Sequence, residues 1–172
     1  MCYKTYWAIV HKNKFTTALN SLGKLLLSKK VGICVYQHNH IFNMEEESID
    51  EAKEFLYRAM ALGNTNALVN LANYYFSLYK KNLLKDNEEE KMLQFLFTAA
   101  DDFSEPKACS LLGDYYFINN NLSFAGNYYK KFISHTDRNG YSFYMLGRIA
   151  DLNLNKSVAI DYYNKAVSQG LW

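Results

Sequence analysis

A period of about 34 residues constrains this chain more than any other feature of its sequence. A short pattern recurs in which a small or apolar residue is followed by apolar residues at the third, fourth and seventh positions after it. Its copies begin at Ala52, Met92, Ala125 and Ala159, and a weaker copy begins at Ala18. The spacing between successive copies stays close to this period and is longest between Ala52 and Met92. Apolar residues arranged in this way share one face of a helix.

A second series lies between these copies. It consists of a leucine and a small residue, at Leu71-Ala72, Leu112-Gly113 and Leu146-Gly147. Each member precedes a copy of the first series, and the separation is equal for the last two members and longer for the first. Two interleaved series with one period predict a repeated pair of helices, and we name the helices of the second series A helices and those of the first series B helices. The fold class predicted is therefore all-α, an α-solenoid of about five tandem antiparallel helix-turn-helix hairpins.

The tyrosine doublets fit this packing. Small residues on both series let two helices approach closely, and aromatic residues fill the space between hairpins. We expect Tyr75 and Tyr116 to pack on A helices and Tyr129 and Tyr163 on B helices, while their doublet neighbours keep the hydroxyl in water. One proline and eight glycines in 172 residues favour helices. The predicted helices cover about 3–11, 15–29, 31–42, 49–62, 66–78, 88–102, 105–118, 121–134, 140–151 and 155–168.

Boundary signals agree with this layout. Ser48 to Glu51 has the form of a capping box, and Pro106 suits the first turn of a helix. Asn121 and Asn155 occupy N-cap positions, and Asn139-Gly140 predicts a turn.

These residues resemble the tetratricopeptide (TPR) repeat and its relative, the Sel-one-like repeat. The small residue after leucine in the A helix, the tyrosine three positions later and the paired alanines of the B helix match both families. "YRAMALGNTNALVNLANYY" (57–75) and "NKAVSQG" (164–170) resemble the Sel-one-like junction. The resemblance covers residues 48–172 of a single domain, 1–172, while residues 1–47 match weakly. It implies a TPR-like superhelix that binds proteins or peptides and is not an enzyme.

In such arrays the A helices line the concave side, which predicts a partner-binding groove. Counting from the leucine landmark of each A helix gives twelve positions. They are Asn66, Val69, Asn73 and Phe76, then Lys107, Ser110, Asp114 and Phe117, then Tyr141, Tyr144, Arg148 and Asp151. Asparagine, aromatic and mixed charged residues suit an extended peptide or a helix, held through backbone hydrogen bonds and apolar contacts. No single sign of charge dominates, so a dedicated carboxylate clamp is not expected.

Two alternatives use other parts of the chain. Leu171, Trp172 and the flank of the last hairpin offer a terminal docking face, which favours a structural subunit that forms a homodimer. Residues 1–40 contain six lysines and no acid, whereas the rest holds thirteen bases and seventeen acids. A basic start of this kind suits an anionic partner, although a nucleic-acid groove is not expected from the mixed charges of the A helices.

No motif of catalysis stands out. Cys2, Cys34 and Cys109 are expected to be free thiols in a reducing compartment. Cys34 and His38, four positions apart, could begin a metal site only if His11 or His40 completed it, so we expect no metal and no cofactor. The longest apolar run near the start, "YWAIV", is far shorter than the roughly 20 residues that cross a bilayer.

The sequence therefore predicts a cytoplasmic, non-enzymatic adaptor for a protein or peptide. Abundant lysine and asparagine are typical of an AT-rich genome, which sharpens the hypothesis to a host-interacting effector or viral protein in the host cytosol.

Overall fold

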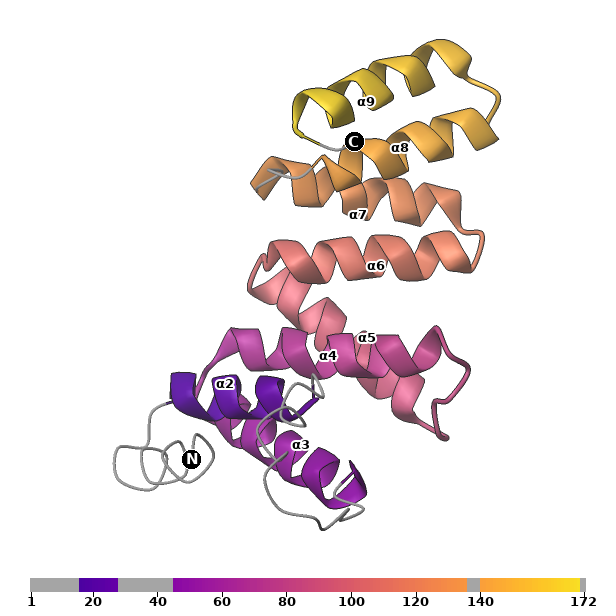
Figure 1. Cartoon of the computed structure of the whole chain (residues 1–172). Helices are drawn as coiled ribbons and strands as arrows, with labels where there is room; N and C mark the ends of the chain where they lie inside the picture. Colours follow the sequence, from indigo (N-terminus) through magenta and orange to yellow (C-terminus); the bar gives the residue numbers. More distant parts are fainter. Residues whose placement is uncertain (1–15, 28–44, 136–139, 171–172) are drawn as a thin grey trace, which may run out of the picture. The chain divides into compact units, whose positions relative to one another are not determined.

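The structure, a computed structural model, describes residues 16–27, 45–135 and 140–170, and these residues form helices without any strand (Figure 1). The fold is all-α, as predicted. Eight α-helices are described, together with one π-helical turn, η2 (Thr98–Asp102). The α-helices are α2 (Thr16–Leu27), α3 (Glu45–Ala61), α4 (Thr65–Tyr79), α5 (Glu88–Phe97), α6 (Pro106–Ile118), α7 (Leu122–His135), α8 (Tyr141–Leu152) and α9 (Lys156–Ser168). None of the helices in this part of the chain is both long and apolar enough to cross a membrane.

Five predicted helices, α4 and α6 to α9, begin and end within one position of the observed bounds. Local signals at the helix start account for three of these, α6, α7 and α9. Pro106 opens α6, and the Asn155 side chain accepts a hydrogen bond from the backbone N–H of Val158. Asn121 accepts one from Phe124 in the same way, at 3.4 Å. These side chains satisfy backbone donors that the first turn of a helix leaves unpaired.

Two predicted boundaries differ, and two predicted helices are not tested. Helix α3 begins at Glu45, so Ser48 lies within its first turn and is not its N-cap. The helix predicted over 88–102 is α-helical only to Phe97 and continues as η2, in which Ala99 and Ala100 are fully buried. The helices predicted over 3–11 and 31–42 lie outside the described residues.

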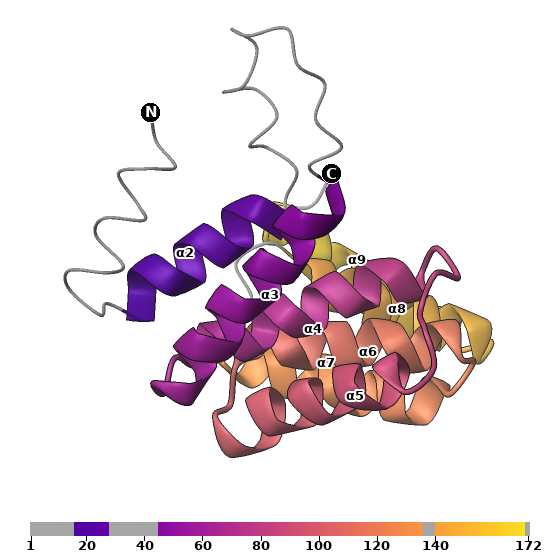
Figure 2. The same ribbon diagram turned by 90° about the horizontal axis from the view of Figure 1, so that it is seen from below.

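The chain divides after Met92 into two compact units, which we describe separately. In the first unit α2 packs along α3, and α4 packs on α3 and contacts α2 (Figure 2). The Asn70 side-chain amide donates a hydrogen bond to the Asn20 side-chain oxygen, at 2.7 Å, and so joins α4 to α2. The Lys53 ammonium of α3 lies 5.4 and 5.8 Å from the rings of Tyr74 and Tyr75 on α4.

Helix α2 behaves as an A helix, which corrects the sequence pattern that assigned Ala18 to the B series. A Cβ atom on Gly23 would meet Leu56 at 2.6 Å and the Ala52 carbonyl oxygen at 2.9 Å. Leu56 and Ala52 belong to the B-series copy on α3, so the small residue of α2 faces a B helix. Leu22-Gly23 is therefore a further leucine–small landmark, followed by a longer connection to its B helix.

The second unit contains two helix pairs, α6 with α7 and α8 with α9, and α8 also packs on α7. In each pair, a glycine of the A helix lies against a tyrosine ring of the B helix. A Cβ atom on Gly113 would lie 2.5 Å from the Tyr129 ring, and one on Gly147 would lie 2.6 Å from the Tyr163 ring. The Tyr129 ring is fully buried, so the close approach of α6 to α7 requires glycine at Gly113. The Tyr163 ring that faces Gly147 is half-buried.

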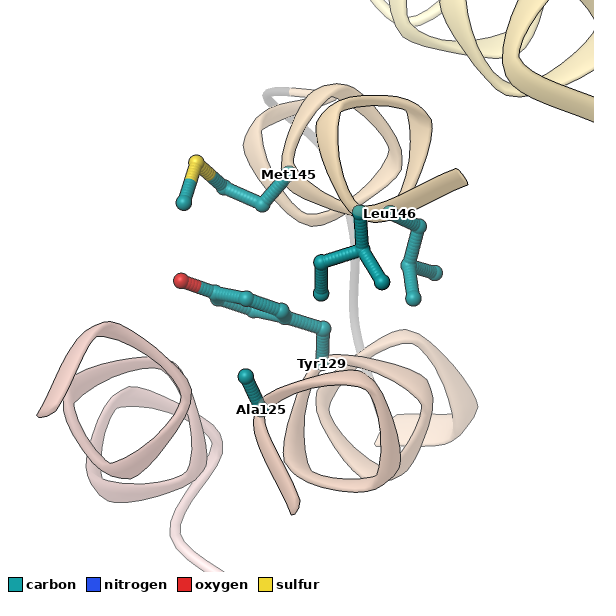
Figure 3. Close-up of a cluster of buried hydrophobic side chains, with 5 residues drawn as sticks. Ala125, Tyr129, Met145 and Leu146 are labelled. Carbon is teal, nitrogen blue, oxygen red and sulfur yellow. The ribbon is translucent and has the colours of Figure 1, made fainter. Parts of the chain in front are cut away.

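The core between α7 and α8 is built on Tyr129. Ala125 and Tyr129 point from α7 toward Met145 and Leu146 on α8 (Figure 3). Tyr129 is fully buried, while its doublet neighbour Tyr128 is half-buried and stacks on Tyr116 with ring centroids 5.8 Å apart. One member of this doublet is thus a core residue and the other lies at the edge of the core, as the sequence pattern predicts.

Candidate functional site

The twelve predicted groove positions lie on three A helices, four each on α4, α6 and α8. Helix α4 belongs to the first unit, whereas α6 and α8 belong to the second. The two sets are therefore described one at a time.

On α4, only the two asparagines are exposed. Asn66 and Asn73 lie at the surface, but Val69 is 5% exposed and Phe76 is 1% exposed. The Phe76 ring stacks on Tyr79, and the Lys80 ammonium lies 5.1 Å from it. Val69 and Phe76 therefore belong to the core and not to a surface groove. The spacing of apolar residues does not show that Phe76 is buried, because the aromatic residues at 74–76 place a large ring on each flank of the helix.

The second set forms a surface that we call the α6–α8 face. It consists of Lys107, Ser110, Asp114 and Phe117 on α6 and Tyr141, Tyr144, Arg148 and Asp151 on α8. Lys107, Tyr144, Arg148 and Asp151 are exposed, and the other four are half-buried. Two contacts among these residues join α6 to α8, one between Asp114 and Tyr141 and the other between Phe117 and Arg148.

The Asp114 carboxylate holds three helices together. One of its oxygens accepts hydrogen bonds from the hydroxyls of Tyr129 on α7 and Tyr141 on α8, both at 2.7 Å. Hydrogen bonds to an ionised acceptor are shorter and stronger than neutral ones. Burial, together with the negative charge of Asp114, raises the pKa of Tyr129 and of Tyr141 above the ordinary value of 10.0. Both hydroxyls therefore stay protonated and act as donors.

A second contact joins α8 back to α6. The Arg148 guanidinium lies 4.8 Å from the centroid of the Phe117 ring. Arg148 is exposed, so this cation–π contact stabilises the pair by about 0.5–1 kcal/mol. Its larger effect is to hold the guanidinium over the face, where a ligand that lies on the face can reach its N–H groups.

The resulting face carries two cations, Lys107 and Arg148, one exposed carboxylate, Asp151, and one exposed ring, Tyr144. The Tyr144 ring lies 6.0 Å from that of Tyr163 on α9, which limits its movement. Charged and aromatic groups held on a rigid scaffold can bind a peptide by ion pairs and ring contacts.

Sequence reasoning placed these residues on one face but missed the bonds among them. The repeat period does relate two of the residues that make these contacts. Asp114 and Arg148 are one repeat period apart and occupy the same position in successive A helices. A polar residue at this position lies beside the tyrosine of its own B helix and near the next A helix. Asp114 bonds to both neighbours, whereas Arg148 contacts Phe117 on the preceding A helix, and the sequence does not show this difference.

Metal-binding and nucleophilic groups are the other candidates for a site. Within 16–27, 45–135 and 140–170, no cluster of three His, Cys, Asp or Glu side chains could hold a metal ion. Cys109 is a free, fully buried thiol whose pKa is raised by burial, which disfavours the reactive thiolate. The Cys34–His38 pair, with His11 and His40, lies outside the described residues, as do Leu171 and Trp172.

Comparison with known protein families gives no match, and comparison with curated proteins gives none either. The function of the chain is therefore inferred from its own residues.

Proposed function

We propose that this protein is a non-enzymatic interaction adaptor that binds an extended peptide segment of a partner protein on the α6–α8 face. The observation that carries the proposal is the pair of contacts across that face. The Asp114–Tyr141 hydrogen bond and the Arg148–Phe117 contact fix α6 and α8 to each other, so the exposed groups are positioned before a ligand arrives. Preorganisation of this kind lowers the entropy cost of binding.

The exposed groups suggest the chemistry of the peptide. Lys107 and Arg148 favour a segment with at least one carboxylate, and Tyr144 favours an apolar or aromatic neighbour. Asp151 lies one helical turn from Arg148 and disfavours a uniformly acidic ligand. A segment with separated acidic and apolar residues fits best.

The proposal also includes the solenoid form and the family suggested by the sequence. Helices that pack in neighbouring pairs, with glycine and tyrosine at matching positions, support a Sel-one-like or TPR-like array. The reduced thiol of Cys109 is compatible with a cytoplasmic location, in the producing cell or in a host.

Selection from a displayed library of random peptides tests the proposal. Peptides selected by the wild type are expected to bind a Lys107→Ala/Tyr144→Ala/Asp151→Ala variant at least about tenfold more weakly. These three side chains are exposed, so helicity by circular dichroism should not change. The control variant, Asn127→Ala/Lys130→Ala, alters exposed residues of α7 and should bind like the wild type.

Equal binding by all three proteins would remove the α6–α8 face as the site. Failure to select any peptide that binds the folded wild type would argue against peptide recognition itself.

A further inference from the structure

Helices α7 and α9 occupy the same position in successive hairpins. Gly113 and Tyr129 in one hairpin correspond to Gly147 and Tyr163 in the next, and their close contacts are alike. Each residue of α9 can therefore be compared with the residue of α7 whose environment it would share.

On α7, one flank is covered by α8. A Cβ atom on Gly126 would contact Ile149 and Leu146 of α8, both at 3.9 Å. Ile133 packs against the same core, and Tyr129 is fully buried there (Figure 3). This flank of a B helix is thus the surface on which the next helix packs.

The matching flank of α9 carries two exposed aliphatic side chains. Ile160 stands in place of Gly126, and Val167 in place of Ile133, and each is 59% exposed. Tyr163, in place of Tyr129, is half-buried. We name Lys156, Ile160, Tyr163 and Val167 the α9 flank.

Polar residues on the rest of the outer surface of α9 show that this exposure is local. Ser157, Asp161, Asn164 and Ser168 are exposed, and by helical spacing they lie opposite the buried Ala159 and Ala166. The helix therefore has a polar side suited to water and an apolar flank suited to contact with another helix.

We infer that the α9 flank pairs with the same flank of a second copy of this chain, forming a two-fold symmetric dimer. Lys156 supports this choice of occupant. It stands in place of Leu122, which packs against the α7–α8 core, so the group that covers it should offer negative potential where α8 offers apolar atoms. In an antiparallel pair of α9 helices, Lys156 of one copy lies near the C-terminal end of the other helix, where the macrodipole is negative.

The same pairing would also remove the exposed apolar residues of the flank from water. Tyr163 lies between Ile160 and Val167 in sequence. In an antiparallel pair centred there, the two aliphatic side chains of each copy pack beside the tyrosine ring of the other. This inference does not depend on peptide binding by the α6–α8 face.

Sedimentation equilibrium of the full chain, over a micromolar concentration range, tests the dimer. The wild type is expected to show a reversible monomer–dimer equilibrium. Ile160→Lys/Val167→Lys should raise the dissociation constant at least about tenfold, because it places charge at the centre of the contact. The control, Ile118→Lys, changes a side chain that is 52% exposed at the end of α6 and should leave the equilibrium unchanged.

Circular dichroism of the two variants should match that of the wild type, since all the substituted residues are exposed. A wild type that remains monomeric throughout would overturn the inference and leave the flank to a helix of another protein. A dimer that persists in Ile160→Lys/Val167→Lys would overturn it by placing the interface elsewhere.

Discussion

Two glycines on neighbouring helices, α6 and α7, have opposite roles in the second unit. Gly113 lies against the buried Tyr129 ring, where a Cβ atom would be 2.5 Å from an aromatic carbon. Gly126 lies in a helix with its nearest neighbours at 3.9 Å, an ordinary contact distance. The same substitution should therefore change stability in opposite directions.

We predict that Gly113→Ala lowers the free energy of unfolding by about 1–3 kcal/mol, because the ring is fully buried and has no room to move. Gly126→Ala should raise it by about 0.5–1 kcal/mol through helix propensity. Urea denaturation followed by circular dichroism measures both. Equal effects of the two substitutions would contradict the packing described for Gly113 and Tyr129.

Ser142 gives a second prediction at the residue scale. Its hydroxyl oxygen is fully buried and has no hydrogen-bond partner. Ala67 and Ala108 occupy the same position in α4 and α6 and are equally buried. Ser142→Ala should therefore raise the free energy of unfolding by about 1 kcal/mol, because an unsatisfied polar group is removed.

The matched control is Ser123→Ala, which alters an exposed serine of α7 and should change stability by less than about 0.5 kcal/mol. A loss of stability in Ser142→Ala would show that the hydroxyl is bonded in solution.

At the scale of elements, the turns that join A to B helices share one backbone form. Asn120 and Leu154, at matching positions of successive hairpins, adopt φ angles of 57° and 59°. The following residue closes each turn by donating to a carbonyl five positions back, from Asn121 to Tyr116 and from Asn155 to Ala150. Asparagine tolerates this left-handed conformation better than leucine does.

The two turns therefore predict a reciprocal pair of substitutions. Leu154→Asn should raise the free energy of unfolding by about 1 kcal/mol, since the Leu154 side chain is 85% exposed and its loss removes little packing. Asn120→Leu should lower it by a similar amount. Urea denaturation of both variants is the measurement, and a stability loss in Leu154→Asn would indicate that this leucine makes a contact that favours folding.

Three of the helices that the sequence predicts to within one residue combine the period with a local signal at their start. Asn121, Asn155 and Pro106 gave accurate helix starts because each acts on its own helix. The π-helical turn at Thr98–Asp102 could not be predicted, because the apolar spacing continues through it and burial of Ala99 and Ala100 is a tertiary effect.

The role of α2 was missed for a related reason. Gly23 meets Leu56 much as Gly113 meets Tyr129, but a far longer stretch of chain separates the first two residues than the second two. A landmark so distant from its B helix does not stand out as part of the same interleaved series.

For the candidate site, the positions counted from the leucine landmark are exposed or half-buried on α6 and α8, whereas two of the four on α4 are buried. The distance of a residue from the landmark identifies the side of the helix on which that residue lies. It does not show what packs on that residue, and this is why Phe76 was expected at the surface.

At the scale of the whole molecule, the tyrosines make stability sensitive to alkaline pH. Burial raises the pKa of Tyr128 to about 12 and also raises those of Tyr74, Tyr75, Tyr129 and Tyr141. The folded state therefore holds these protons more tightly than the unfolded state, whose tyrosines titrate near 10. Their contribution is fully present below pH 10 and is lost as pH rises from 10 through 12.

We accordingly predict a urea midpoint that is independent of tyrosine ionisation below pH 10 and falls steadily above it. Phenolate absorbance should rise at higher pH in the native protein than in the protein unfolded by guanidinium chloride. Coincident titration curves for the native and unfolded protein would contradict the burial of these hydroxyls.

The measurement that tests the central claim most directly is the mapping of a selected peptide on the isotopically labelled protein by amide chemical shifts. The proposed adaptor role predicts that the largest changes fall at Lys107, Tyr144, Arg148 and Asp151, with smaller ones at Asp114 and Tyr141. Changes confined to α7 or to the α9 flank, with the α6–α8 face unaffected, would contradict it.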